Sequence, residues 1–175
     1  MNKDVINLLA KYNQAANEKM DALIKTLTPE EWDKNLGGFF KSIRELCSHL
    51  YVCDYILLKR YFKLRDFKLA KDSFFTQEYT FKDVLFPAKD EYLAKRPELD
   101  KKIIAFSEEL AEDDFDKILK FADSKGNPKE KNFAGTLLHA FNHETHHRGM
   151  ISVYLEILGK PNDFNALLAI VEKQG

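Results

Sequence analysis

Apolar residues recur at steps of three and four positions along several long segments of the chain. This spacing places them on one face of an α-helix, so each segment predicts an amphipathic helix rather than a strand. The first segment covers residues 3–27. The second covers residues 42–61 and opens with a capping box formed by Ser42 and Glu45. The apolar positions are Val5, Leu8, Leu9, Tyr12, Ala16, Met20, Leu23, Ile24 and Leu27, then Ile43, Leu46, Leu50, Cys53, Ile56, Leu57 and Tyr61.

Two further long helices are predicted in the second half of the chain. Residues 88–114 form a third helical segment, in which Pro97 predicts either a kink or a helix start nearer that residue. The fourth helix is predicted over residues 132–158 and ends at two stop signals, Gly159 and Pro161.

The segments between the long helices predict short or irregular elements. "TPEEW" combines a cap, a first-turn proline and a capping-box glutamate, so it predicts a short turn of helix. Residues 66–87 contain aromatic residues without a clear period and predict an irregular connection with one short helix. A Gly-Asn-Pro turn within residues 115–133 predicts a small two-stranded ribbon. Residues 163–173 predict a short terminal helix or a packed tail.

These elements together predict one all-α domain over residues 1–175. We expect a four-helix bundle with long crossover connections and one short β-ribbon before the last long helix. Lys and Arg total 27 against 28 Asp and Glu, so neither nucleic acid nor an anionic membrane is expected as a partner. No run of about 18 apolar residues predicts a membrane span. The charged N-terminus is unlike a signal peptide, and Cys47 and Cys53 lie on different helix faces, so we expect reduced thiols and a cytoplasmic location.

Four of the five histidines lie in the predicted fourth helix. His139, His143 and His147 are spaced by four residues and therefore form a row along one face. Two imidazoles one turn apart hold a transition metal poorly without a third ligand. His49, on an apolar face of the second long helix, should point into the bundle and supply it. Because bundle cores are where facing helices assemble metal sites, we predict a His49–His143–His147 site with an open position for water or substrate.

The same stretch contains the letters of a zinc-protease motif, His143-Glu144-x-x-His147. The extended motif requires glycine and histidine where this chain has Met150 and Val153, and no suitably placed downstream glutamate replaces them. The sequence therefore disfavours a protease.

Other polar residues near the row have less specific interpretations. Cys53 follows His49 by one helical turn and could reach a soft metal, but a buried thiol acting as a small hydrophobe is the favoured interpretation. His146 is expected to be a structural hydrogen-bonder, and Arg148 and Glu144 are expected to pair with neighbours or face solvent.

Three stretches carry a resemblance to a known family: "YNxxAN" in the first helix, "SIRELCSHL" in the second and "HxFNHxTHHRG" in the fourth. In this combination, spanning nearly the whole chain, the sequence resembles the DinB-like (damage-inducible DinB / YfiT-like) family of four-helix metalloproteins. The resemblance implies that His49, His143 and His147 bind a divalent ion, nickel or zinc, with water at the open position. It also implies a homodimer. The family motif usually continues with glutamine where this chain has Met150.

Relatives of this fold include thiol-dependent transferases and an isomerase, which use thiols such as bacillithiol, mycothiol or glutathione. The resemblance therefore implies a metal-dependent enzyme of the thiol S-transferase or hydrolase type, acting on a small-molecule thiol or electrophile. No catalytic residue is assignable, and the candidates for lining a pocket are His139, Met150, Tyr12 and Asn13. The alternative is a non-catalytic metal-binding stress-response protein, for which a fourth protein ligand would be evidence. A DNA-repair factor should instead carry a basic patch.

Overall fold

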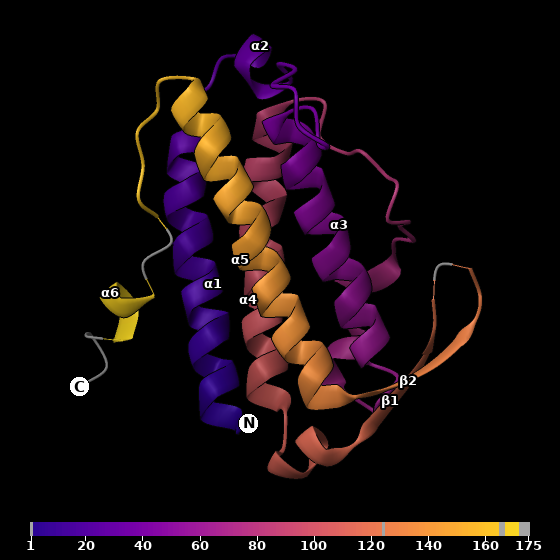
Figure 1. Cartoon of the computed structure of the whole chain (residues 1–175). Helices are drawn as coiled ribbons and strands as arrows, with labels where there is room; N and C mark the ends of the chain where they lie inside the picture. The colour runs from indigo at the N-terminus through magenta and orange to yellow at the C-terminus, as the bar shows by residue number, and fades with distance from the viewer. Residues whose placement is uncertain (1, 124, 165–166, 172–175) are drawn as a thin grey trace.

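Four long helices dominate the computed structural model, which describes residues 2–123, 125–164 and 167–171 (Figure 1). They are α1 (Lys3–Ile24), α3 (Ile43–Tyr61), α4 (Lys89–Glu109) and α5 (Phe133–Ile157). The all-α class and the helix bundle predicted from the sequence are confirmed. The first helix ends at Ile24 rather than at Leu27, because the last three residues form a turn although Leu27 stays buried.

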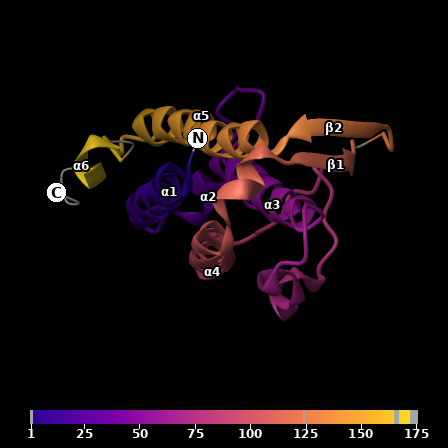
Figure 2. The same ribbon diagram turned by 90° about the horizontal axis from the view of Figure 1, so that it is seen from below.

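The helices form a ring in which α1 and α3 each contact both α4 and α5 (Figure 2). The start of α4 lies at the end of α1, because the Lys89 amine donates to the Lys25 carbonyl over 2.9 Å. The start of α3 lies beside the residues that precede α4, since the Ser48 hydroxyl donates to the Leu85 carbonyl. Helices α3 and α4 therefore run in the same direction, and a long connection must return the chain between them.

Two helix caps precede α3. The capping box predicted at Thr28 is complete, whereas at Ser42 only half of the predicted box forms, because Glu45 accepts from the Lys41 backbone instead. Thr28 accepts from the Glu31 backbone and Glu31 accepts from the Thr28 backbone, which begins α2 (Pro29–Trp32). Ser42 accepts from the Glu45 backbone at the start of α3. Each cap satisfies helix N–H groups that have no partner within the helix, so the register of α3, and with it the direction of its histidine, is fixed locally.

The connection between α3 and α4 contains two short 3₁₀ helices, η1 (Lys68–Lys71) and η2 (Ser73–Thr76). One short helix was predicted there, so the prediction was incomplete. The segment is held by side chains rather than by regular structure, because Phe67, Phe75 and Phe86 are all buried in the core. Anchors of this kind have no helical period, which is why the sequence pattern did not resolve them.

Of the two alternatives predicted at Pro97, the helix start nearer that residue is wrong, because α4 begins at Lys89 and runs past the proline. After α4 come a 3₁₀ turn, η3 (Glu112–Asp116), and the predicted ribbon of β1 (Ile118–Ala122) and β2 (Pro128–Asn132). The strands are antiparallel, and the ribbon projects from the bundle beside the start of α5 (Figure 2). None of the helices in the described part of the chain is long and apolar enough to cross a membrane.

The predicted terminal element falls partly outside the described residues. A short helix α6 (Leu168–Val171) lies within the segment 163–173, whereas residues 165–166 and 172–173 are not described.

Candidate metal centre

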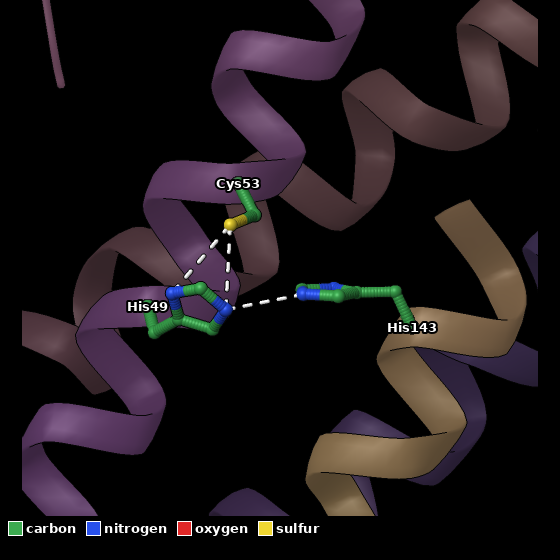
Figure 3. A group of neighbouring side chains, drawn as sticks. All are labelled: His49, Cys53 and His143. Atoms are coloured by element: carbon green, nitrogen blue, oxygen red, sulfur yellow. Dashed lines mark hydrogen bonds between the residues drawn. The ribbon is translucent and has the colours of Figure 1, made fainter. Parts of the chain in front are cut away.

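Three histidine rings from two helices converge inside the bundle. His49 projects from α3, and His143 and His147 project from α5. The ring centres of His49 and His143 are 5.0 Å apart, those of His49 and His147 are 4.7 Å apart, and those of His143 and His147 are 4.3 Å apart. The Nε2 atoms of His49 and His143 face each other across 3.1 Å (Figure 3).

Cys53 adds a thiol to this group. Its Sγ lies 3.6 Å from both ring nitrogens of His49, one turn earlier on α3 (Figure 3). The ligand atoms of His49, Cys53 and His143 all lie within 4.8 Å of one another. The sequence favoured a purely apolar role for Cys53. The side chain is indeed buried, yet its sulfur points at the imidazoles.

The spacing of these donor atoms fits a single metal ion. Two nitrogens on one tetrahedral zinc lie about 3.3–3.4 Å apart, and a thiolate sulfur and a nitrogen lie about 3.6 Å apart. The observed separations are 3.1 Å between the two Nε2 atoms and 3.6 Å between Sγ and Nε2 of His49. In addition, Nδ1 of His143 and Nδ1 of His147 are buried without a hydrogen-bond partner among the described residues. Because the nitrogen of His143 that faces His49 is Nε2, its unpartnered Nδ1 does not bear on the ion, and the spacing of the donor atoms alone makes the group compatible with a bound cation.

The environment keeps these imidazoles neutral at pH 7. Burial lowers the pKa of His143 to about 4, helped by the charges of His49, His139 and His146. Burial also lowers the pKa of His147 to about 3, and it lowers the pKa of His49 against the opposing effect of Asp54. A neutral imidazole offers a lone pair to a metal, whereas an imidazolium does not. By contrast, burial raises the pKa of the Cys53 thiol to about 12, so without a metal the thiol is protonated.

Phe40 covers the histidines toward the start of α3. Its ring centre lies 4.6 Å from that of His49 and 5.4 Å from that of His147. The loop that carries Phe40 is tied to α5, because the Tyr154 hydroxyl donates to the Phe40 carbonyl over 2.6 Å. A Cβ at Gly38 would collide with the same hydroxyl, so glycine is required there for the loop to approach α5.

Toward the end of α3, the donor group opens into a cavity of about 670 Å³. This volume lies within the usual range for small-molecule sites, about 300–1,000 Å³. The walls come from α3, the start of α5, the ribbon and the connection that precedes α4. The lining residues are His49, Cys53, Leu57, Arg60, Tyr61, Phe81, Phe121, Lys131, Asn132, Gly135, Thr136, His139 and His143.

Behind the histidines, a second face of the same helices carries buried charges. Glu144 on α5 is 2% exposed and its Oε2 accepts from Arg148 over 3.3 Å. Asp54 on α3 pairs with Arg96 of α4 over 2.7 Å, and Arg96 also pairs with Asp100. Glu144 therefore does not lie beside the donor group as a protease glutamate must. Glu144 and Arg148 were expected either to pair with neighbours or to face solvent, and in the structure they are buried and pair with each other.

The four predicted pocket residues lie in different places. His139 lines the cavity that opens from the donor group. Asn13 is buried on α1 and accepts from Arg148, and Tyr12 is buried under the same guanidinium, whose carbon lies 5.3 Å from the ring centre. Met150 is half-buried and packs against the core. The residues of the cavity that the sequence analysis did not single out come mainly from other elements, such as Phe81, Phe121 and Lys131.

Comparison with known proteins places the chain in a family. A sequence model described as the DinB family matches residues 1–169. The chain belongs to the DinB family. The crystal structure of a DinB-like protein, YjoA from Bacillus subtilis, is similar to this DinB chain with a TM-score of 0.61 and 16% sequence identity, over 88% of this chain and 94% of that chain. At that identity the likeness shows the fold alone. No curated protein matches the chain.

Proposed function

We propose that this DinB protein is a divalent-metal-dependent enzyme of the thiol S-transferase or hydrolase type that acts on a small molecule. One observation carries the proposal: the histidine and cysteine donors form part of the wall of a cavity of about 670 Å³. Structural metal sites are closed by protein ligands, whereas catalytic sites keep a position that substrate can reach. Donors that line a cavity fit the second description.

The chain's own residues perform two tasks in this proposal, and the ion supplies a third. The neutral rings of His49, His143 and His147 supply lone pairs without first losing a proton. Phe40 shields the rings on one side, so a reactant must approach from the cavity. A divalent ion held here would supply the positive charge that favours an ionised thiol or water near neutral pH.

The donor chemistry also limits the choice of metal. Imidazole nitrogens with a thiol nearby suit zinc or nickel better than magnesium or calcium, which prefer oxygen ligands. We therefore propose zinc or nickel as the resident ion.

A second candidate function is a non-catalytic metal-binding protein, and the position of Cys53 favours it. If the sulfur binds together with all three histidines, four protein ligands close the site. The distance of 3.6 Å between Sγ and Nε2 of His49 would allow these two residues to bind one ion, and the donor atoms of His143 lie within 4.8 Å of both. The two functions therefore differ in whether Cys53 is an obligatory ligand.

Metal analysis of Cys53→Ala separates the two functions. The untagged protein, His143→Ala, Cys53→Ala and His146→Ala should be compared for metal content and for turnover of monochlorobimane with a panel of low-molecular-weight thiols. We expect Cys53→Ala to keep about one ion per chain and to remain active, because three histidines suffice. His143→Ala should lose both, and His146→Ala, an exposed histidine of the same helix, serves as the matched control.

Two results would count against the enzyme. Loss of the ion in Cys53→Ala would favour the closed, non-catalytic site. Metal binding without turnover on any thiol or hydrolysable ester would leave only the metal-binding function.

A further inference from the structure

The cavity that opens from the donor group is positively charged. Arg60 and Lys131 line it, His49 and His143 in its wall are neutral, and no aspartate or glutamate is among its described lining residues. The chain as a whole has a net charge of −1, so this one-sided lining does not follow from composition. A cavity lined by one sign of charge concentrates ligands of the opposite sign.

Arg60 is held in place by aromatic rings and not by a carboxylate. Its guanidinium carbon lies 4.3 Å from the ring centre of Phe121 on β1 and 5.8 Å from that of Phe81. The side chain is half-buried, and it makes no ion pair or side-chain hydrogen bond with any described residue. A guanidinium stacked on a ring keeps the N–H groups of its edge available for a planar anion.

Arg65, five residues later, also stacks on a ring, but its N–H groups have oxygen partners within the protein. Its guanidinium carbon lies 3.9 Å from the Phe67 ring centre. In addition, its Nε pairs with Asp114 over 3.0 Å and one terminal nitrogen donates to the Glu109 carbonyl over 2.7 Å. Arg60 has the stacking but no oxygen partner among the described residues, so its N–H groups are open to water or to a ligand acceptor.

The lysines of the ribbon repeat this contrast. Lys120 pairs with Glu130 over 3.0 Å, and Lys129 pairs with Asp123 over 3.5 Å. Lys131 has no ion pair with any residue that the structure describes, and it lines the cavity. Two cations without acidic partners therefore border one space, whose remaining walls include Leu57, Tyr61 and the two phenylalanines.

We propose that the cavity binds small molecules that have an apolar body and an oxyanion, either a carboxylate or a phosphate ester. The oxyanion pairs with the edge of Arg60 and with Lys131, and the apolar body lies against Phe81, Phe121 and Leu57. This orientation leaves the other end of the ligand facing His49, Cys53 and His143. The inference deepens the proposed function and rests on it for the statement that such a ligand is a substrate, whereas binding of the anion does not require turnover.

Binding of matched charged and neutral probes tests the inference. Isothermal titration calorimetry of the purified protein should compare 4-phenylbutyrate and 2-phenylethyl phosphate with 4-phenylbutanamide, whose body is the same but uncharged. We expect the anions to bind at least about tenfold tighter than the amide, since a charge-assisted bidentate hydrogen bond contributes on this scale. The preference should weaken as salt is added.

Substitution of the two cations makes the test specific. In Arg60→Gln the anions and the amide should bind within about twofold of each other, while Arg60→Lys should keep part of the preference because the charge remains. Lys131→Gln should reduce the preference by a few fold, as expected of an exposed charge. Lys129→Gln removes a charge from the same strand and should leave binding unchanged, and far-UV circular dichroism verifies that each variant is folded.

The outcomes separate this inference from the proposed function. Equal binding of anion and amide, no binding of any probe, or an undiminished preference in Arg60→Gln would overturn the inference. Loss of the preference in His143→Ala but not in Arg60→Gln would also overturn it, because the oxyanion would then be bound at the donor group. A further outcome is that the protein prefers the anions to the amide through Arg60 and yet binds no metal and turns over no substrate. That result would support the anion site and refute the proposed enzyme.

Discussion

Helices α3 and α5 present two kinds of polar side chain on neighbouring faces. One face carries His49 and Cys53 on α3, with His143 opposite on α5; the adjacent face begins one residue later, at Asp54 and Glu144. A step of one residue turns a helix by about 100°, so each helix serves two different environments at the same height in the bundle.

The two faces differ in whether their side chains have oppositely charged partners within the protein. On the closed face, Arg96 and Arg148 bridge carboxylates and amides from all four long helices, including Asn17, which donates to Asp100 over 2.9 Å. On the open face, the Nε2 atoms of His49 and His143 face each other, and both residues line a cavity. We infer that the closed face holds the helices in register, while the open face is available to a ligand.

The largest expected effect is on the closed face. Arg96→Met removes a fully buried guanidinium and leaves Asp54 and Asp100 without their cation. Breaking one partner of a buried pair costs about 3–5 kcal/mol of unfolding free energy, which urea denaturation measures. Lys71→Met is the control, since Lys71 pairs with Asp66 at the surface and its loss should cost at most about 1 kcal/mol.

Urea denaturation of His143→Ala tests whether the two faces differ. A loss of unfolding free energy similar to that of Arg96→Met would contradict the difference. In the metal-free protein we expect His143→Ala to cost at most about 1 kcal/mol of unfolding free energy. His143 contacts the neutral His49 ring and forms no ion pair with a described residue, so its removal leaves no buried charge without a partner. A loss above 3 kcal/mol would mean that the open face is also structural.

A smaller effect is expected from pH. Burial lowers the pKa of His143 from 6.5 to about 4, so between these values the unfolded chain takes up a proton that the folded chain does not. The stabilising contribution is therefore complete above pH 6.5 and is lost as the pH falls toward 4. Denaturation of the metal-free protein should show a greater loss of stability from pH 7 to 5 in wild type than in His143→Ala.

The difference between the two proteins is the measure, because other groups act in the opposite direction. Burial raises the pKa of Asp21 to about 7, so the folded chain holds that proton more tightly than the unfolded chain. This contribution cancels between wild type and variant. Identical pH dependence in both would show that His143 is not desolvated in solution.

The smallest effect is expected at the cover of the site. Tyr154→Phe removes the hydroxyl that donates to the Phe40 carbonyl, which should cost about 1 kcal/mol of unfolding free energy. The metal content should not change, because the donors remain. Loss of the ion would mean that the loop, and not the helices alone, positions the histidines.

The long helices were predictable because their signals are local. Ser42 with Glu45 fixed the start of α3, and the steps of three and four in residues 3–27 and 42–61 located two helices to within a few residues. Pro97 left the start of α4 open in the prediction, whereas in the structure burial of Tyr92 and Leu99 on both sides of the proline stabilises the helix across it. Tertiary packing thus overrode a local signal.

The candidate site was predictable only in part. The four-residue spacing of His143 and His147 and the apolar face around His49 indicated three rings that the structure does bring together, although their role as ligands stays a prediction. Cys53 has the same four-residue spacing from His49, but spacing does not give the rotamer that turns sulfur toward the ring. Arg60, Phe81, Phe121 and Lys131 meet only because the ribbon and the long connection fold back over α3, which no local pattern encodes.

The ribbon can be changed independently of the helices that carry the histidines. It contributes Phe121 and Lys131 to the cavity while the donor side chains stand on rigid helices. Exchanging residues 118–132 would alter the cavity wall and leave the helices that carry the histidines untouched. A library confined to this hairpin is thus a compact starting point for engineering new selectivity.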